Sequence, residues 1–277
     1  MALRVLPYEY FIQKSMELDR TENKLPEYSQ KLFYDVKRKL NIKKELSKES
    51  IIKPTTLGKQ EEVIATLFKY FNKITDKTYD KLSPEVFSLI SLKISDKEKV
   101  CVTFFRVILN NSFFCHLYAK LYKGFIEISN EFIDVLEIQT SQYVEQIKHI
   151  TYVSPTEDYD KYCDYVKQVE GIKNFTNFLI QCLNQKIIQG KLLLDLAITF
   201  QNCCLNNIDI QEKILLNEIY ISNVAIIIID THEIICKNKT WGQFNENHRA
   251  LIDSHGNGMN KKIHFKLLDI TEQLGVI

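Results

Sequence analysis

Apolar residues recur at helical spacing along most of the chain. Between Gln60 and Phe71 they occupy Val63, Ile64, Leu67 and Phe68, and this i, i+3, i+4 pattern predicts an amphipathic helix. Comparable patterns predict helices over residues 75–90, 95–108, 113–126, 129–149, 175–183, 192–205 and 261–274. At Pro84 the second helix either kinks or gives way to a new one. Gly171 is expected to open a second half of the chain.

Residues 215–235 are almost wholly apolar and rich in β-branched side chains. Periodicity alone does not separate a buried helix from a strand there. We predict a helix, because its neighbours are helices and an isolated strand would leave its backbone unpaired. The longest uninterrupted apolar run, residues 224–229, is too short to span a membrane, so no membrane contact is expected.

The pattern amounts to roughly ten helices in antiparallel pairs, with about 40 residues per pair, a period that suits HEAT-type repeats. We therefore predict an all-α solenoid of about five helix pairs over residues 55–277. Residues 1–54 differ from the rest and predict an N-terminal arm with one amphipathic helix, carried by Leu32, Phe33, Val36 and Leu40.

Charge argues against a dedicated nucleic-acid binder. The chain has 36 basic and 35 acidic residues, whereas phosphate recognition usually brings a clear basic excess. Contact with mRNA is therefore expected only through local basic patches. The candidates are Lys37, Arg38, Lys43, Lys44 and Lys261. A solvated helix face explains these clusters more simply.

The residues predict no catalytic, metal or cofactor site. Phosphate-loop, dinucleotide and nucleophile-elbow motifs are absent from the sequence. His232 and Cys236 share a helix face, but a tetrahedral site needs more ligands. Cys115 and His116 are adjacent, so on a helix they diverge by about 100°. A hydrolase that uses a Cys or His is the remaining enzymatic alternative.

Cysteine usage predicts a cytoplasmic location. The chain has seven cysteines, an odd number, and the first residues lack the long apolar core of a signal peptide. Reduced thiols are therefore expected. Abundant Lys, Ile, Asn and Tyr are typical of an AT-rich genome, as in some protists and large DNA viruses; for a viral protein the location would be the host cytoplasm.

Three segments, in order, match the sequence motifs of one known family. Residues 71–79, FNKITDKTY, are similar to its L-N-K-L-T-P-E-K-F, with Asp76 in place of Pro. Residues 105–121 match F-x-x-A-I-x-x-P-x-F-x-x-x-Y-A-x-M at most apolar positions, with Ser112 in place of Pro. Residues 262–270, KIHFKLLDI, resemble R-I-R-F-M-L-Q-D-V, and a weaker likeness covers residues 171–188. By these motifs the chain resembles the middle domain of translation initiation factor 4 gamma.

The resemblance implies a crescent of five HEAT-type helix pairs that is not an enzyme. It implies a scaffold of the cap complex, with no cofactor, that binds and stimulates a DEAD-box RNA helicase of the initiation factor 4A type. By position, Phe71, Ile74 and Tyr79 would contact the helicase's C-terminal lobe, flanked by Lys73 and Asp76. Lys262, His264 and Asp269 would lie by its N-terminal lobe. The protein would act as a monomer in a hetero-complex.

Without the family, exposed apolar residues at the 72–75 turn suit a protein hot spot; the alternative is that Phe71, Ile74 and Tyr79 are core residues. The arm suggests cap-binding protein 4E as a further partner, through Tyr28, Leu32 and Phe33, although only three residues separate the Tyr from the Leu where the 4E motif has four. Two other functions stay open: an adaptor in mRNA decay, splicing or cap binding, and a helical repeat that binds RNA directly.

Overall fold

The computed structural model describes residues 59–93 and 97–275. Within these ranges the chain forms ten α-helices, one short 3-10 helix and no strand, so the predicted all-α class is confirmed. All of these helices belong to the second of the two units into which the chain divides, Thr56–Ile277. The predicted arm of residues 1–54 lies outside the described residues.

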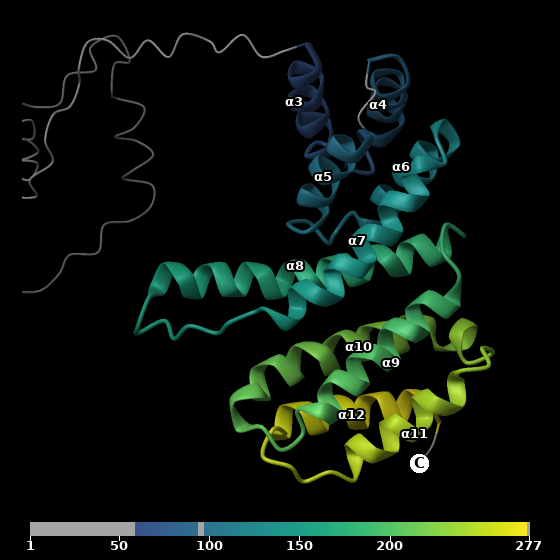
Figure 1. Ribbon diagram of the computed structural model, residues 1–277. Helices are drawn as coiled ribbons and strands as arrows, with labels where there is room; N and C mark the ends of the chain where they lie inside the picture. The colour runs from purple at the N-terminus through teal and green to yellow at the C-terminus, as the bar shows by residue number, and fades with distance from the viewer. Residues whose placement is uncertain (1–58, 94–96, 276–277) are drawn as a thin grey trace, which may run out of the picture. The chain divides into compact units, whose positions relative to one another are not determined.

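The helices follow one another with short connections (Figure 1). The first five are α3 (Lys59–Phe71), α4 (Tyr79–Lys93), α5 (Lys97–Ile108), α6 (Cys115–Ile128) and α7 (Glu131–Lys148). The next five are α8 (Tyr159–Asn184), α9 (Gly190–Asn206), α10 (Ile214–Ile235), α11 (Trp241–Ile252) and α12 (Lys261–Gln273). The 3-10 helix η1 (Gln211–Lys213) leads directly into α10.

Helices two apart in sequence pack against each other. One series runs through α4, α6, α8, α10 and α12, and the alternate helices pair as α3 with α5, α5 with α7, and α9 with α11. Sequence neighbours also pack, most extensively α9 on α10, and Figure 1 shows α9 to α12 side by side. This packing between helix pairs is consistent with a helical repeat.

Two helices are longer than the sequence suggested. α4 continues past Pro84 as one helix, so no second helix starts there. α8 begins after Asp158, whose side chain accepts a hydrogen bond from the Lys161 N–H at 3.1 Å, and passes Gly171 without a break. The expected start of a second half at Gly171 is therefore wrong. The glycine lies where α8 passes the end of α5, and a Cβ there would be 3.5 Å from the carbonyl oxygen of Leu109.

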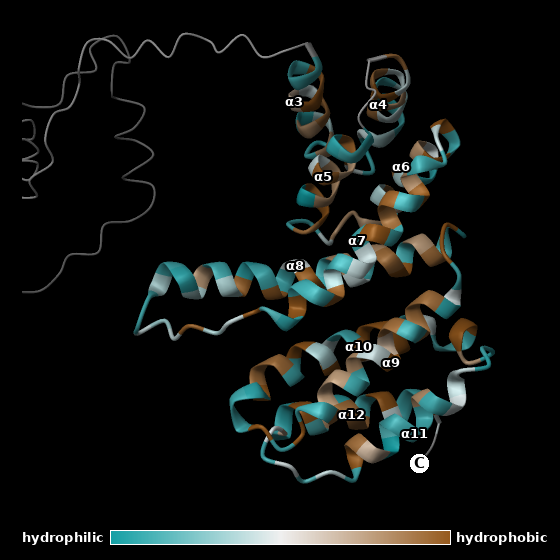
Figure 2. Ribbon diagram, in the orientation of Figure 1, coloured by the Kyte–Doolittle hydropathy of each residue, from teal (hydrophilic) through white to brown (hydrophobic). Residues whose placement is uncertain are grey.

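The segment predicted as a helix against its β-branched composition is α10, which packs on α8, α9 and α12. Hydrophobic residues predominate along it, with short polar stretches between them (Figure 2). By length and composition Gln211–Ile235 is apolar enough to cross a membrane, but 61% of its apolar window is buried inside the fold. The run of residues 224–229 therefore understates how apolar this helix is, and burial explains why it is apolar on all sides.

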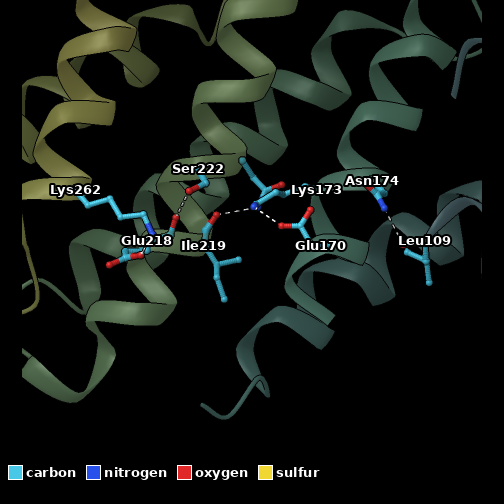
Figure 3. Close-up of polar contacts among 9 residues, drawn as sticks. Leu109, Glu170, Lys173, Asn174, Glu218, Ile219, Ser222 and Lys262 are labelled. Atoms are coloured by element: carbon cyan, nitrogen blue, oxygen red, sulfur yellow. Dashed lines mark hydrogen bonds and ion pairs between the residues drawn. The ribbon is translucent and has the colours of Figure 1, made fainter. Parts of the chain in front are cut away.

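A chain of buried hydrogen bonds joins α7, α8 and α10. The Tyr143 hydroxyl lies 2.7 Å from the Thr176 hydroxyl, which donates to Asn223 Oδ1 at 2.8 Å. Asn223 Nδ2 donates in turn to the Ile219 carbonyl at 2.8 Å. At the same junction Asn174 Nδ2 donates to the Leu109 carbonyl at 2.9 Å, which ties α8 to the end of α5 (Figure 3). Buried polar groups that are all paired fix the register of neighbouring helices.

Candidate protein-binding interface

The corner between α3 and α4 is buried, which corrects the expected apolar contact loop. Phe71 is 0% exposed and Ile74 1% exposed, and Tyr79 is also buried. The Phe71 ring packs edge-on against Phe104, with ring centroids 5.1 Å apart, and against Phe125 at 6.1 Å. These three apolar side chains belong to the core, so the prediction that they contact a helicase lobe is wrong.

Hydrogen bonds fix this corner in place. The Tyr118 hydroxyl of α6 donates to the Phe71 carbonyl at 3.2 Å, and Asn72 Nδ2 donates to the Phe68 carbonyl at 2.8 Å. The Thr75 N–H donates to the Thr78 hydroxyl at 2.9 Å. Carbonyls left over at the end of α3 are thus satisfied within the fold, and the turn has no need of a partner to complete it.

Polar neighbours of the corner remain at the surface. Lys73 and Asp76 are exposed, and Asp76 Oδ1 lies 3.3 Å from Nε2 of His116, at the start of α6. Three residues before His116, the ring of Phe113 is 78% exposed. The Asp76–His116 contact joins the α3–α4 turn to the α5–α6 turn. We call the exposed residues of these two turns, Lys73, Asp76, Phe113 and His116, the loop edge.

The second surface is on α12. One stripe of this helix, formed by Ile263, Leu267 and Ile270, is buried at the i, i+4, i+7 spacing. On another stripe Phe265 is 65% exposed and Leu268 is 47% exposed. Large apolar side chains placed together at a surface mark candidate interfaces.

The loop before α12 is held against the α9–α10 connection. A Cβ on Gly256 would lie 2.2 Å from the Ile208 carbonyl oxygen, and one on Gly258 would lie 2.2 Å from the Asn207 carbonyl oxygen. The Gly258 N–H donates to the Ile208 carbonyl at 2.7 Å. Only glycine allows two backbones to approach this closely, so these two residues set where α12 begins.

The first turn of α12 is anchored to α10 by one carboxylate. Asn260 caps the helix by accepting from the Ile263 N–H at 3.0 Å, and its Nδ2 donates to Glu218 Oε1 at 2.7 Å. The other oxygen of Glu218 pairs with the Lys262 ammonium (Figure 3). Lys262 therefore has its charge compensated within the fold, which leaves it less able to serve a partner.

A groove of about 590 Å³ runs beside α12, and we call it the α12 groove. It is lined by Ser254, His255, Gly256, Met259, Asn260, Lys261, His264, Phe265 and Leu268. The rings of His255 and His264 are nearly parallel, with centroids 6.5 Å apart. The lining contains one lysine, Lys261, so the groove combines apolar surface with a single positive charge.

The four residues predicted as site residues on α12 lie on two different stripes of the helix. Lys261 and His264 line the α12 groove, whereas Lys262 and Asp269, seven residues apart, share a neighbouring stripe of the helix. Phe265, Leu268 and Phe113 were not predicted as site residues. Phe265 and Leu268 could have been found from the sequence, because residues 261–274 contain a second apolar stripe in addition to the one that is buried.

Several predictions fall outside the described residues. These are the RNA-binding candidates Lys37, Arg38, Lys43 and Lys44 and the cap-binding-protein candidates Tyr28, Leu32 and Phe33. Among the RNA-binding candidates, only Lys261 lies in the part of the chain that the structure describes, and its side chain is exposed.

The four buried thiols do not resemble a catalytic nucleophile. Burial raises the pKa of Cys101, Cys115 and Cys204 to about 12, and it raises the pKa of Cys182 well above its usual value. Reactive cysteines instead have a lowered pKa and an accessible sulfur. Within residues 59–93 and 97–275, no cluster of three or more metal-ligating side chains occurs.

No protein-family model matches the chain, and no curated protein is similar to it in sequence. The likeness to the middle domain of initiation factor 4 gamma therefore stands on the quoted residues alone.

Proposed function

We propose that the helical domain is a non-enzymatic scaffold whose helix pairs form a HEAT-type solenoid and whose surface binds a partner protein. The observation that carries the proposal is the α12 surface, where Phe265 and Leu268 are exposed beside a groove that also contains Lys261. Exposed apolar anchors ringed by polar groups are typical of protein-binding sites. Ten helices that pack on their second neighbours support the solenoid.

The partner we propose is a DEAD-box RNA helicase of the initiation factor 4A type. The two surfaces lie in the segments that resemble the family: the loop edge around residues 73–116, and α12 within residues 262–270. A scaffold that contacts both lobes of a helicase favours one arrangement of the lobes by its difference in affinity for the two states, typically about 1–3 kcal/mol. Cytoplasmic assembly into a cap complex, with cap-binding protein 4E and mRNA as further partners, belongs to the same proposal.

The test is to mix the full chain with a purified helicase of this type. We expect a stable complex by gel filtration and a faster RNA-dependent ATPase. Replacing three residues of the loop edge together (Lys73→Glu, Asp76→Lys and Phe113→Ala) should weaken the complex while leaving the circular dichroism of the helices unchanged, because these side chains are exposed.

The matched control combines Val102→Ala and Lys237→Glu, which change an exposed apolar residue and an exposed lysine outside both surfaces. It should bind like the wild type. Absence of a complex together with an unchanged ATPase would reject the helicase as the partner and favour an adaptor role in another mRNA pathway.

A further inference from the structure

We propose that the α12 groove binds one particular kind of segment: an acidic amphipathic helix of a partner protein, with apolar side chains that pack on Phe265 and Leu268. This inference rests on the proposed function only in taking α12 as a protein-binding surface. It adds the chemical class of the segment that binds there, which neither the helical fold nor the resemblance specifies.

The apolar part of the groove has the spacing of a helix-binding site. Phe265 and Leu268 are three residues apart and so lie on adjacent turns of one stripe. Half-buried Met259 is the third apolar side chain of the lining. These three are the large apolar side chains of the lining, and amphipathic helices bind apolar grooves through anchors at i, i+3 or i+4 and i+7. A groove of about 590 Å³ has room for several such anchors.

Charge favours an acidic helix. The ionisable side chains of the lining are Lys261, His255 and His264. The exposed carboxylate of Asp209 lies beside Gly256, at the loop end of the groove, so Lys261 is the charge that attracts an acidic segment along α12. Among the described residues Lys261 has no ion-pair partner, in contrast to Lys262, which is paired with Glu218. The N-terminal end of α12 lies at the same place and adds the partial positive charge of its helix dipole.

The distribution of charge also sets the direction of the bound helix. Asp269 lies on the neighbouring stripe of α12, and Glu272 lies one turn beyond Leu268. Carboxylates of the partner are therefore favoured beside Lys261, and they are disfavoured beside the C-terminal half of α12 and beside Gly256, where Asp209 lies. The acidic residues of the segment should be concentrated where it passes the first turn of α12.

Single-stranded RNA fits this groove less well. RNA grooves combine a track of cations along the backbone with stacking platforms. Here Lys262 is paired with Glu218. The side chains that follow Lys261 along the same stripe of α12 are the apolar Phe265 and Leu268. One uncompensated lysine beside an apolar pair suits a peptide better than a phosphate chain.

The experiment uses two synthetic helices of about 18 residues, or five turns. Both carry Leu at i, i+3, i+4 and i+7 positions; one has Glu on its polar face and the other has Lys at the same places. Each is labelled with fluorescein and titrated with the full chain, and fluorescence anisotropy is followed. We expect saturable binding of the acidic helix and at least about tenfold weaker binding of the basic one.

Variants of the chain locate the binding. Phe265→Ala with Leu268→Ala should raise the Kd for the acidic helix about tenfold or more, as for other apolar anchors. Lys261→Glu should also raise it, and that difference should shrink as salt is added. The controls Ile229→Ala, at an exposed apolar position of α10, and Lys237→Glu should leave the Kd unchanged.

Four results would overturn the inference: equal binding of the two helices, binding of neither, a Kd indifferent to Phe265 and Leu268, or displacement of the acidic helix by an RNA oligonucleotide that itself needs these residues. A homodimer that dissociates on Phe265→Ala would show a second copy of the chain as the occupant. The two proposals fail separately. If the chain binds the acidic peptide but not the helicase, only the helicase proposal is rejected. If the chain binds the helicase and this binding is unchanged by substitution of Phe265 and Leu268, only the acidic-helix proposal is rejected.

Discussion

Protonation of His248 should make the fold sensitive to mild acid. His248 is in α11, and its side chain is buried. Its Nε2 lies 3.0 Å from the Thr271 hydroxyl, which itself donates to the Leu267 carbonyl at 3.0 Å. Thr271 must therefore accept from His248, so the ring is neutral with its proton on Nε2. Its Nδ1 is buried and has no hydrogen-bond partner among the described residues, so a second proton there would be unsatisfied.

Burial lowers the pKa of His248 from 6.5 to about 4. Because the folded pKa is below the unfolded one, the neutral ring stabilises the fold fully above about pH 6.5, and this stability is lost as pH falls toward about 4. At about 1.4 kcal/mol per unit the complete loss is about 3 kcal/mol. Between about pH 7 and pH 5 the same relation gives a loss of about 2 kcal/mol.

The assay is urea unfolding followed by circular dichroism at several pH values, for the wild type and His248→Gln. The glutamine keeps an N–H donor for Thr271 but does not titrate. The variant should therefore lose about 2 kcal/mol less than the wild type on going from about pH 7 to pH 5. Thr271→Val is the control, because it removes the acceptor but keeps the histidine; its stability should be lower at every pH with the slope retained. Parallel profiles for His248→Gln and the wild type would refute the reasoning.

Three further predictions concern the core, the α11–α12 loop and the thiols. Phe71→Ala should cost about 3–5 kcal/mol of unfolding free energy, whereas Lys73→Ala should stay within about 0.5 kcal/mol; equal effects would mean that the corner is open. Gly256→Ala should destabilise the fold by about 2 kcal/mol or more, because the new Cβ would meet the Ile208 carbonyl at 2.2 Å. Its matched control, Gly242→Ala, has no atom within 4 Å and lies in a helix, so it should gain about 0.5–1 kcal/mol in the same denaturation assay. Alkylation by a neutral maleimide, followed by mass spectrometry, should modify Cys163, Cys203 and Cys236 before the four buried thiols, and early modification of Cys182 would contradict its burial.

The helices were predictable where apolar residues recur at helical spacing. Residues 60–71 and 261–274 carry such stripes, and both form helices that bury the expected face. For α10 the composition favoured a strand, and the helical neighbours rather than local preference gave the right answer. Gly171 misled, because a glycine also occurs inside a helix where another segment passes close by, and that neighbour, Leu109, is distant in sequence.

The site residues were harder to predict because the exposure of a side chain depends on segments that are distant from it in the sequence. Phe71 and Ile74 looked like a hot spot beside a charged turn, but Phe104, Tyr118 and Phe125 cover that corner. Lys262 looked free, and Glu218, forty-four residues earlier, neutralises it. A local sequence pattern does not reveal contacts between residues this far apart, whereas the second apolar stripe of α12 is visible in the sequence itself.

The central claim is that the α12 surface and the loop edge, rather than the buried α3–α4 corner, bind a helicase. Hydrogen–deuterium exchange of the full chain, with and without a 4A-type helicase, tests it most directly. We expect slower exchange around residues 109–116 and 254–268 when the helicase is present, with α9 and α10 unchanged because they are already protected by burial. Unaltered exchange at both surfaces, in a sample where the helicase is bound, would contradict the account.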